Sequence, residues 1–447
     1  MGNAGAYPRD NSYSQNKKWQ LAEHPFSFLL ALLLILVAPF TTKYLVFAAF
    51  GICLFRLCAY SATSFLRDVA WLMCFSNLFR SPSGDSLFSL LLLFGVALLL
   101  VKKGARANAA LAFAVMLIAL LTLRMQGDFS NYIWIAGSVL VTVLLADVMR
   151  ESDIKTILIS YCIAILASSF FALFFRNFSM YNDYVQGDAL AIWGEEAIRF
   201  KGLFSDANYY AFFLILALSL LVQLYFSRNI SLRSFSLMGI ATVIFGLMTY
   251  GKTFFLVLLL LVACFIVFLF AKRKVLLGMV VVLAVGIFAL LTFSGKMEAL
   301  SVIIARFKEA DNVNDLTTGR FDSWKNYLQY IFADVKHFAV GYGLRAPLIN
   351  KLGTHNLYLE IAYYLGIGGL LLFVALAVAL RYAVSGKDTA SVSFATRALK
   401  GLSLLAFLVF YFSLQGMFTP LLYLQYLLAV SGGLLFHSKT EKVVLDI

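Results

Sequence analysis

The sequence predicts an all-α polytopic membrane protein, and three observations lead to that prediction. Hydrophobic residues make up 62% of the 447 residues and charged residues only 13%, whereas soluble domains are about half apolar and about a quarter charged. The apolar runs are roughly 16–22 residues long, the length with which a helix crosses about 30 Å of hydrocarbon. These runs are uniformly apolar rather than alternating, which argues against a transmembrane β-barrel.

Fourteen apolar runs are candidate membrane spans, so we expect about 12–14 transmembrane helices. The weakest candidate is 64–79, because Arg67 and Asp68 lie near its start and a charge inside a span is unfavourable. The fourteen runs are 26–40, 44–60, 64–79, 86–101, 108–124, 131–147, 154–175, 207–226, 234–250, 252–270, 274–294, 355–380, 400–417 and 420–436.

Basic residues in short loops predict the orientation of these spans, because lysine and arginine are enriched on the cytoplasmic side. With fourteen spans, all the basic loops and both termini fall on the same side of the membrane, whereas with thirteen they do not. We therefore keep 64–79 as a candidate span. We therefore expect cytoplasmic tails at 1–24 and 437–447 around a single transmembrane domain, 25–436. The basic loops are 102–106, 228–233, 272–274 and 381–400.

Residues 1–24 are polar, so we expect a retained first helix rather than a cleaved signal peptide. The formal net charge of +13 is explained by topology and lipid headgroups, so membrane lipids rather than nucleic acid are the expected partners. The five cysteines lie in apolar runs without metal-ligand spacing. No Asp-x-Asp, His-Glu-x-x-His or P-loop pattern occurs. We expect no metal, no nucleotide and no cofactor.

Two long segments fall on the extracytoplasmic side, at 176–206 and 295–354. Loops of this length are uncommon unless they are functional or disordered. The second contains the stretch 324–331, which mixes aromatic, apolar and polar residues. This pattern predicts one or two amphipathic helices that lie on the membrane or fold over a cavity.

The first loop ends in a cationic sequence at the mouth of a span. Arg199 and Lys201 are followed by Gly202, and then by Ser205, Asp206 and Asn208. A serine or aspartate here suits a helix N-cap, and helix N-termini with nearby cations suit phosphate groups. The alternative is a pair of interfacial basic residues beside an ordinary cap.

Lys252 lies in a very short turn between two spans that the topology places outside the cytoplasm. The positive-inside rule does not explain it. Its side chain either extends to the membrane interface or faces a polar cavity and meets an anion.

The second loop holds Arg320, Arg345, His355 and Asn356, and Glu360 follows within the next span. A histidine at the mouth of a span suits acid–base chemistry near neutral pH, although it also suits a helix cap. An intramembrane carboxylate is a functional candidate, and the alternative is that it pairs with a nearby cation for packing.

These residues converge on one side of the membrane, at loop–helix junctions. A cluster of cations with one histidine and few acids predicts binding of a polyanionic, phosphorylated substrate.

The chain resembles the O-antigen ligase and polymerase superfamily over roughly 195–375. The order and spacing of several short motifs carry this resemblance, whereas the N-terminal half matches only as a string of hydrophobic spans. The motifs are the segment from Arg199 to Tyr210, Tyr250-Gly-Lys-Thr, Thr318-Gly-Arg320 with Trp324, Gly341-Tyr-Gly343, Thr354-His355-Asn356 and Gly366-Ile-Gly-Gly.

The resemblance implies a bacterial inner-membrane glycosyltransferase with a GT-C-like arrangement of its helices. It also implies a metal-independent, inverting mechanism and an active site on the periplasmic side. The donor would be an oligosaccharide on undecaprenyl diphosphate. A polymerase passes it to a second lipid-linked repeat unit, alongside a chain-length regulator, and a ligase passes it to lipid A–core. Arg320 and Arg199 would hold the diphosphate, and His355 would orient or deprotonate the acceptor hydroxyl. Lys201, Lys252, Arg345, Asn208 and Asn356 would assist binding.

Between the two enzymes, a polymerase is favoured slightly over a ligase. Two classes of non-enzymatic protein remain as alternatives. A lipid-linked oligosaccharide flippase would need ionisable groups along its spans and often has internal repeats, but the polar groups here gather on one side. A scaffold in envelope assembly would leave the cations and His355 without a role.

Overall fold

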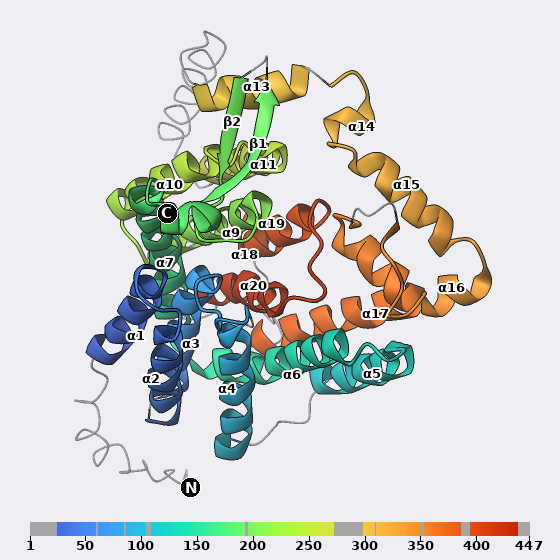
Figure 1. The fold of residues 1–447 in the computed structure, drawn as a ribbon, viewed down its shortest axis with the longest axis horizontal. Helices are drawn as coiled ribbons and strands as arrows, with labels where there is room; N and C mark the ends of the chain where they lie inside the picture. Colours follow the sequence, from blue (N-terminus) through green and yellow to red (C-terminus); the bar gives the residue numbers. More distant parts are fainter. Residues whose placement is uncertain are drawn as a thin grey trace, which may run out of the picture.

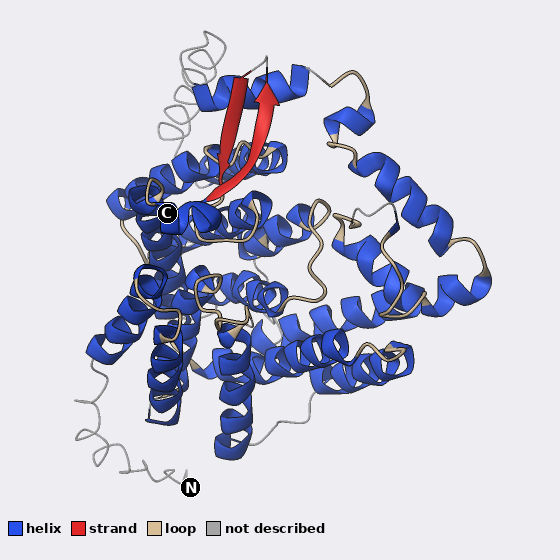
Figure 2. Ribbon diagram, viewed as in Figure 1, coloured by secondary structure: helices blue, strands red, loops and turns tan. Residues whose placement is uncertain are grey.

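The computed structural model describes residues 25–59, 61–84, 86–103, 109–192, 195–271, 298–308, 310–349, 353–385 and 394–436. Almost all of this is helix (Figures 1 and 2), and five helices are long and apolar enough to cross a membrane. The predicted all-α membrane fold is therefore confirmed. The run 274–294 and both tails lie outside the described residues, and the count of fourteen crossings stays a prediction.

The helices follow the predicted apolar runs closely in the N-terminal half. They are α1 (Pro25–Val37) with η3 (Ala38–Phe40), α2 (Leu45–Ala59), α3 (Ala62–Leu72) with η4 (Met73–Phe75), α4 (Leu87–Lys103), α5 (Ala109–Arg124), α6 (Phe129–Glu151) and α7 (Ile154–Phe175).

The C-terminal half alternates long helices with shorter connecting ones. It comprises α8 (Ser179–Val185), α9 (Ala207–Phe226), α10 (Leu232–Leu247), α11 (Lys252–Ala271), α13 (Glu298–Lys308), α14 (Val313–Leu316), α15 (Arg320–Ile331), α16 (Val335–Val340), α17 (Leu357–Ser385), α18 (Phe394–Lys400), α19 (Leu402–Phe410), α20 (Pro420–Ser431) and η6 (Gly432–Phe436).

Helix α9 lies at the centre of the bundle (Figure 1), where α7, α10, α11 and α19 contact it. In an apolar stretch of 18 residues of α9, 83% of the stretch is buried inside the protein. This explains why the apolar residues of α9 extend all round the helix rather than along one stripe. Asp206 is its N-cap and accepts from the backbone N–H of Asn208 at 2.7 Å and of Tyr209 at 3.3 Å. The predicted cap is confirmed.

The weak candidate 64–79 is a short helix rather than a full-length one. Helix α3 has 11 residues and rises about 16 Å, short of the hydrocarbon thickness of about 30 Å. Its Asp68 pairs with Arg56 of α2 at 2.8 Å, and both side chains are buried. The ion pair explains how a carboxylate is tolerated there, since a buried charge needs a partner.

The loop 176–206 contains an element that the sequence analysis did not predict. Strands β1 (Gln186–Ile192) and β2 (Glu195–Phe200) form an antiparallel hairpin. The backbone N–H of Phe200 donates to the carbonyl of Met248 at 3.0 Å, and that of Lys201 to Val185 at 3.0 Å. The end of β2 is thereby held against the α10–α11 turn.

Within 298–308, 310–349 and 353–354, the parts of the loop 295–354 that the structure describes, there are four helices, α13 to α16, rather than one or two. They form an arm that arches beside the bundle and returns to α17 (Figure 1, gold to orange). Helix α15 includes the predicted stretch 324–331, and its buried residues Ser323, Tyr327 and Ile331 recur every fourth position. This spacing is that of one helical face, so the predicted amphipathic helix is confirmed.

Helix α17 is broken at Gly366, whose φ is +69°. The break frees carbonyls of the preceding turn, and those of Tyr363 and Tyr364 accept from the backbone N–H groups of Tyr342 and Gly343, both at 2.9 Å. A Cβ at Gly341 would lie 2.5 Å from the backbone of Gly366. Two glycines thus allow the end of the arm to cross α17 in backbone contact.

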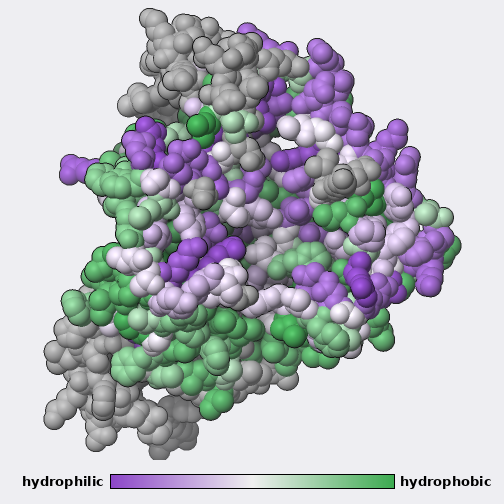
Figure 3. Space-filling model, viewed as in Figure 1, coloured by the Kyte–Doolittle hydropathy of each residue, from purple (hydrophilic) through white to green (hydrophobic). Residues whose placement is uncertain are grey.

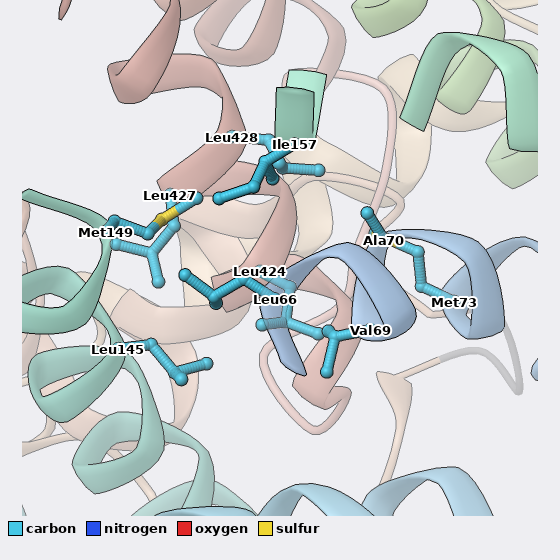
Figure 4. A pocket seen from close by; sticks show the side chains of 10 residues that line it. All are labelled: Leu66, Val69, Ala70, Met73, Leu145, Met149, Ile157, Leu424, Leu427 and Leu428. Carbon is cyan, nitrogen blue, oxygen red and sulfur yellow. The ribbon is translucent and has the colours of Figure 1, made fainter. Parts of the chain in front are cut away.

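An apolar cavity lies inside the bundle between α3, α6, α7 and α20 (Figure 4). Its lining side chains are leucine, valine, alanine, isoleucine and methionine. A void without polar groups offers no partner for a charged ligand, so this cavity belongs to core packing.

Candidate active site

Three arginines from separate segments form what we call the arginine cluster: Arg199 of β2, Arg306 of α13 and Arg320 of α15. Burial, together with the charges of Arg199 and Arg320, lowers the pKa of Arg306 to about 10. Burial also lowers the pKa of Arg320, and among nearby charges Asp206 opposes this while Arg199 adds to it. These mutual effects show that the cations share one environment, in which a bound anion would relieve their repulsion.

Arg199 joins three parts of the chain at the end of β2. Its Nε donates to the carbonyl of Thr249 at 2.9 Å and one terminal nitrogen donates to Oδ1 of Asn208 at 2.9 Å. The side chain is only 7% exposed. It therefore fastens the hairpin to the α10–α11 turn and to the first turn of α9.

Arg306 was not predicted from the sequence. It lies on α13 and donates to the carbonyl of Tyr250, a residue in the left-handed backbone region with φ +50°. In the sequence it is one of several charged residues near the start of the long loop, and nothing local separates it from an interfacial cation. Its signal was its place on a short amphipathic helix followed by a turn.

Arg320 is the first residue of α15 and follows Gly319, whose φ is +78°. One of its terminal nitrogens donates to the carbonyl of Ser413 at 2.8 Å, which ties the arm to the α19–α20 connection. On the same helix, Nε1 of Trp324 donates to the carbonyl of Thr354 at 3.0 Å. Helix α15 therefore brings Arg320 and the segment before α17 together.

His355 lies beside Arg320 in the turn before α17. It adopts φ +45°, and its backbone N–H donates to Oε1 of Gln415 at 3.2 Å. Its imidazole is half-buried and has no hydrogen-bond partner among the residues that the structure describes. Burial lowers its pKa, the charge of Arg320 lowers it further, and Asp206 opposes both. His355 is therefore neutral near pH 7 and able to accept a proton.

Glu360 holds the loop that supports His355. Its Oε2 accepts from the backbone N–H of Gly416 at 2.8 Å and of Met417 at 2.9 Å. The hydroxyl of Tyr209 donates to the carbonyl of Gln415 in the same loop. The partners of this buried carboxylate are thus backbone N–H groups, and it positions Gln415 rather than neutralising a cation.

Lys252 and the two predicted asparagines have contacts within the protein. Nζ of Lys252 donates to the carbonyls of Asp315 at 3.1 Å and Leu316 at 3.2 Å, at the end of α14. Asn208 accepts from Arg199. Oδ1 of Asn356 accepts from the first backbone N–H groups of α17. These side chains support the arginine cluster and His355 through the elements that carry them.

Two further predicted residues lie away from these contacts. Lys201 is half-buried, two residues after Arg199. Arg345 is exposed, and no contact among the described residues joins it to the arginine cluster.

All these contacts join segments that the predicted topology places on one side of the membrane. Figure 3 shows hydrophilic residues over the part of the molecule that carries α13 to α16, and hydrophobic residues over the lower part that carries α4 to α6. The arrangement therefore offers cations and a neutral imidazole at one end of an apolar bundle. Such groups can bind a phosphorylated amphiphile and remove a proton from a hydroxyl near it.

Comparison with known proteins agrees with this chemistry. The chain matches the family described as O-antigen ligase over residues 235–374, just under a third of its length. No curated protein sequence matches it. The matched range includes Lys252, Arg306, Arg320 and His355, whereas Arg199 lies before it. Residues 235–374 thus resemble the O-antigen ligase family, and this match supports membership of the O-antigen ligase and polymerase superfamily.

Proposed function

We propose that this chain is an inner-membrane glycosyltransferase that takes a glycan from undecaprenyl diphosphate at the periplasmic face. The observation that carries the proposal is that Arg199, Arg306 and Arg320 lie close to one another, and that Arg320 lies beside His355. We favour a polymerase, in which the acceptor is a second lipid-linked repeat unit. The slight preference rests on the many predicted spans, and a ligase acting on lipid A–core is the alternative.

The reaction we propose is a direct displacement that inverts the anomeric carbon and needs no metal. The acceptor hydroxyl oxygen forms a bond to that carbon as its bond to the diphosphate oxygen breaks. The bonding electrons leave with the diphosphate, and the hydroxyl proton passes to His355. The leaving group gains negative charge, so cations held in place beforehand stabilise the transition state more than the ground state.

Arg320 and Arg306 are the cations that we assign to the leaving diphosphate. Both are desolvated, and a charge interaction is stronger where water is excluded. Arg199 adds a third positive charge near Arg320 and Arg306, and its hydrogen bonds to Thr249 and Asn208 hold it in place. Lys201 and Arg345 remain predicted contacts to the glycan or diphosphate.

Purified protein in nanodiscs, supplied with an undecaprenyl diphosphate-linked repeat unit, tests this function. A ladder of longer lipid-linked glycans without lipid A–core supports the polymerase. A product that forms only when lipid A–core is added supports the ligase instead. No product under either condition, combined with movement of the lipid-linked unit between leaflets, would replace both with a flippase.

A further inference from the structure

A second cationic site lies on the N-terminal half, outside the arginine cluster. A cavity of about 100 Å³ opens where the start of α2 meets the turn before α4 and helix α8. Lys43, Arg80, Ser81 and Tyr184 supply its polar lining, and Pro39 and Pro82 form part of its walls. A single water needs only about 15 Å³, so the cavity has room for a larger polar group.

The lining of this cavity favours an anion. Two cations face it from separate segments, and none of the described lining residues is acidic. Among the described residues, the side chains of Lys43 and Arg80 have no hydrogen-bond or ion-pair partner. Like charges beside one cavity repel each other, and an anion that accepts from both removes that repulsion. A phosphate group has oxygens enough for both cations and for the hydroxyl groups beside them.

The surroundings of the cavity indicate that this phosphate belongs to a lipid. Tyr44, in the turn after Lys43, is 69% exposed, and Phe47 of α2 is 45% exposed. Leu29 and Leu33 of α1 are also more than half exposed, and α1 packs along α2. Exposed apolar helix surface next to interfacial aromatics is typical of contact with acyl chains. A lipid whose chains lie along α1 and α2 would carry its headgroup to the cavity.

The cavity is connected to the candidate active site through one short segment. Tyr184 lines the cavity, and the next residue, Val185, accepts from the backbone N–H of Lys201 at 3.0 Å. Lys201 is two residues from Arg199. With 3.8 Å for each chain step, Tyr184 and Arg199 have Cα atoms less than about 20 Å apart. Two lipids bound at these places would lie side by side at the same end of the bundle.

We propose that this cavity binds the phosphate group of the acceptor lipid, while the arginine cluster binds the diphosphate of the donor. The inference rests on the proposed glycosyl transfer, which requires two amphiphiles at once. In the proposed reaction, the oligosaccharide of the repeat unit connects the phosphate of the acceptor to the hydroxyl that reacts. The accepting sugar can therefore reach His355 although its phosphate is held elsewhere.

A direct binding measurement tests the site without requiring catalysis. Full-length protein is mixed with dioleoyl phosphatidic acid in detergent, and bound lipid is measured by native mass spectrometry. The double variant Lys43→Gln with Arg80→Gln should bind at least about tenfold more weakly, since it loses two charge-assisted hydrogen bonds. Arg176→Gln, which removes an exposed cation of the same predicted side, should bind like wild type. Both comparisons are repeated with the substitution Arg306→Met added to each protein. Lipid bound at the arginine cluster is then distinguished from lipid bound at the cavity.

Three outcomes of this measurement would overturn the proposal. Equal affinity of wild type and the double variant would remove Lys43 and Arg80 from any phosphate site. Equal affinity for phosphatidylcholine would make the interaction apolar rather than anionic. Full displacement by inorganic phosphate at the same concentration as the lipid would make the ligand a free ion.

A kinetic measurement separates the site from the proposed function. In the transfer assay, the double variant should raise the KM for the acceptor about tenfold and leave kcat unchanged. An unchanged acceptor KM contradicts the proposal, whereas loss of kcat alone points to a disturbed active site. If wild type forms no product, the proposed function fails, and the binding result still decides whether the cavity holds a phosphorylated lipid.

Discussion

Replacing Arg306 by methionine should remove activity without destabilising the protein. The fall in the pKa of Arg306 from its usual value to about 10 corresponds to roughly 3 kcal/mol by which the surroundings disfavour its charge. The substitution also leaves the carbonyl of Tyr250 without this donor, which costs about 1–3 kcal/mol. The two effects nearly offset each other. The free energy of unfolding should therefore stay the same or rise by up to about 2 kcal/mol.

Transfer activity should respond very differently to the same change. Removal of one preorganised donor to a developing oxyanion lowers kcat by about 10²–10³-fold, or about 2.7–4 kcal/mol. The assay measures elongation of a lipid-linked repeat unit and thermal unfolding on the same preparation. Pyrophosphate at ten times its Kd should stabilise wild type by about 1.4 kcal/mol and the variant by clearly less.

Lys308→Met is the matched control, because Lys308 is exposed on the same helix two residues later. It should leave stability within about 0.5 kcal/mol of wild type and keep the pyrophosphate effect. The reasoning is refuted if Arg306→Met unfolds well below wild type while it retains activity. It is equally refuted if pyrophosphate stabilises the variant as much as wild type, because Arg306 would then be a structural residue.

Further substitutions test the other assignments. Arg320→Ala and His355→Ala should each lower transfer at least about 10²-fold with normal membrane insertion, and wild-type rates in both would contradict the site. Burial and the charge of Arg320 lower the pKa of His355 from its usual value, so the rate should stay constant around neutral pH and fall only on acidification; a rise on acidification would exclude His355 as the base. Lys252→Gln, which loses two hydrogen bonds to α14, should lower stability by about 1–2 kcal/mol but transfer less than tenfold. Gly366→Ala should destabilise by more than about 3 kcal/mol because its Cβ would lie 2.5 Å from backbone atoms at the end of α16. Gly51→Ala, with nothing within 4 Å, should be neutral by thermal unfolding.

The helices could be predicted from sequence because each long apolar run has one low-energy state in a membrane. The residues that were predicted less well are those whose structure depends on distant partners. The hairpin at 186–200 forms where Phe200 pairs with Met248, and local pattern does not contain that contact. Asp68 of α3 likewise has its partner, Arg56, on another helix, and that pairing cannot be read from the local pattern.

The candidate site was predicted in part for a related reason. Arg199, Arg320 and His355 stood out because they lie at the mouths of helices, where a cation or histidine has an evident use. Arg306 did not, since its role follows only from the position of α13 over Tyr250. Lys252 looked like a ligand for an anion, but carbonyls of α14 already accept from it. Sequence identified the charges, whereas the fold determines which of them are engaged within the protein.

The crossing of Gly341 and Gly366 has a mechanical consequence. The end of the arm is joined by backbone hydrogen bonds to α17 where that helix is broken at Gly366. Helix α16 therefore cannot move away from the bundle while α17 stays in place. Any movement that widens the approach to Arg320 must bend α17 at the same point. The first turns of that helix follow directly after His355, so the base and the cations would shift together. The proposed active site would then open by bending of α17 at Gly366 rather than by movement of α16 alone.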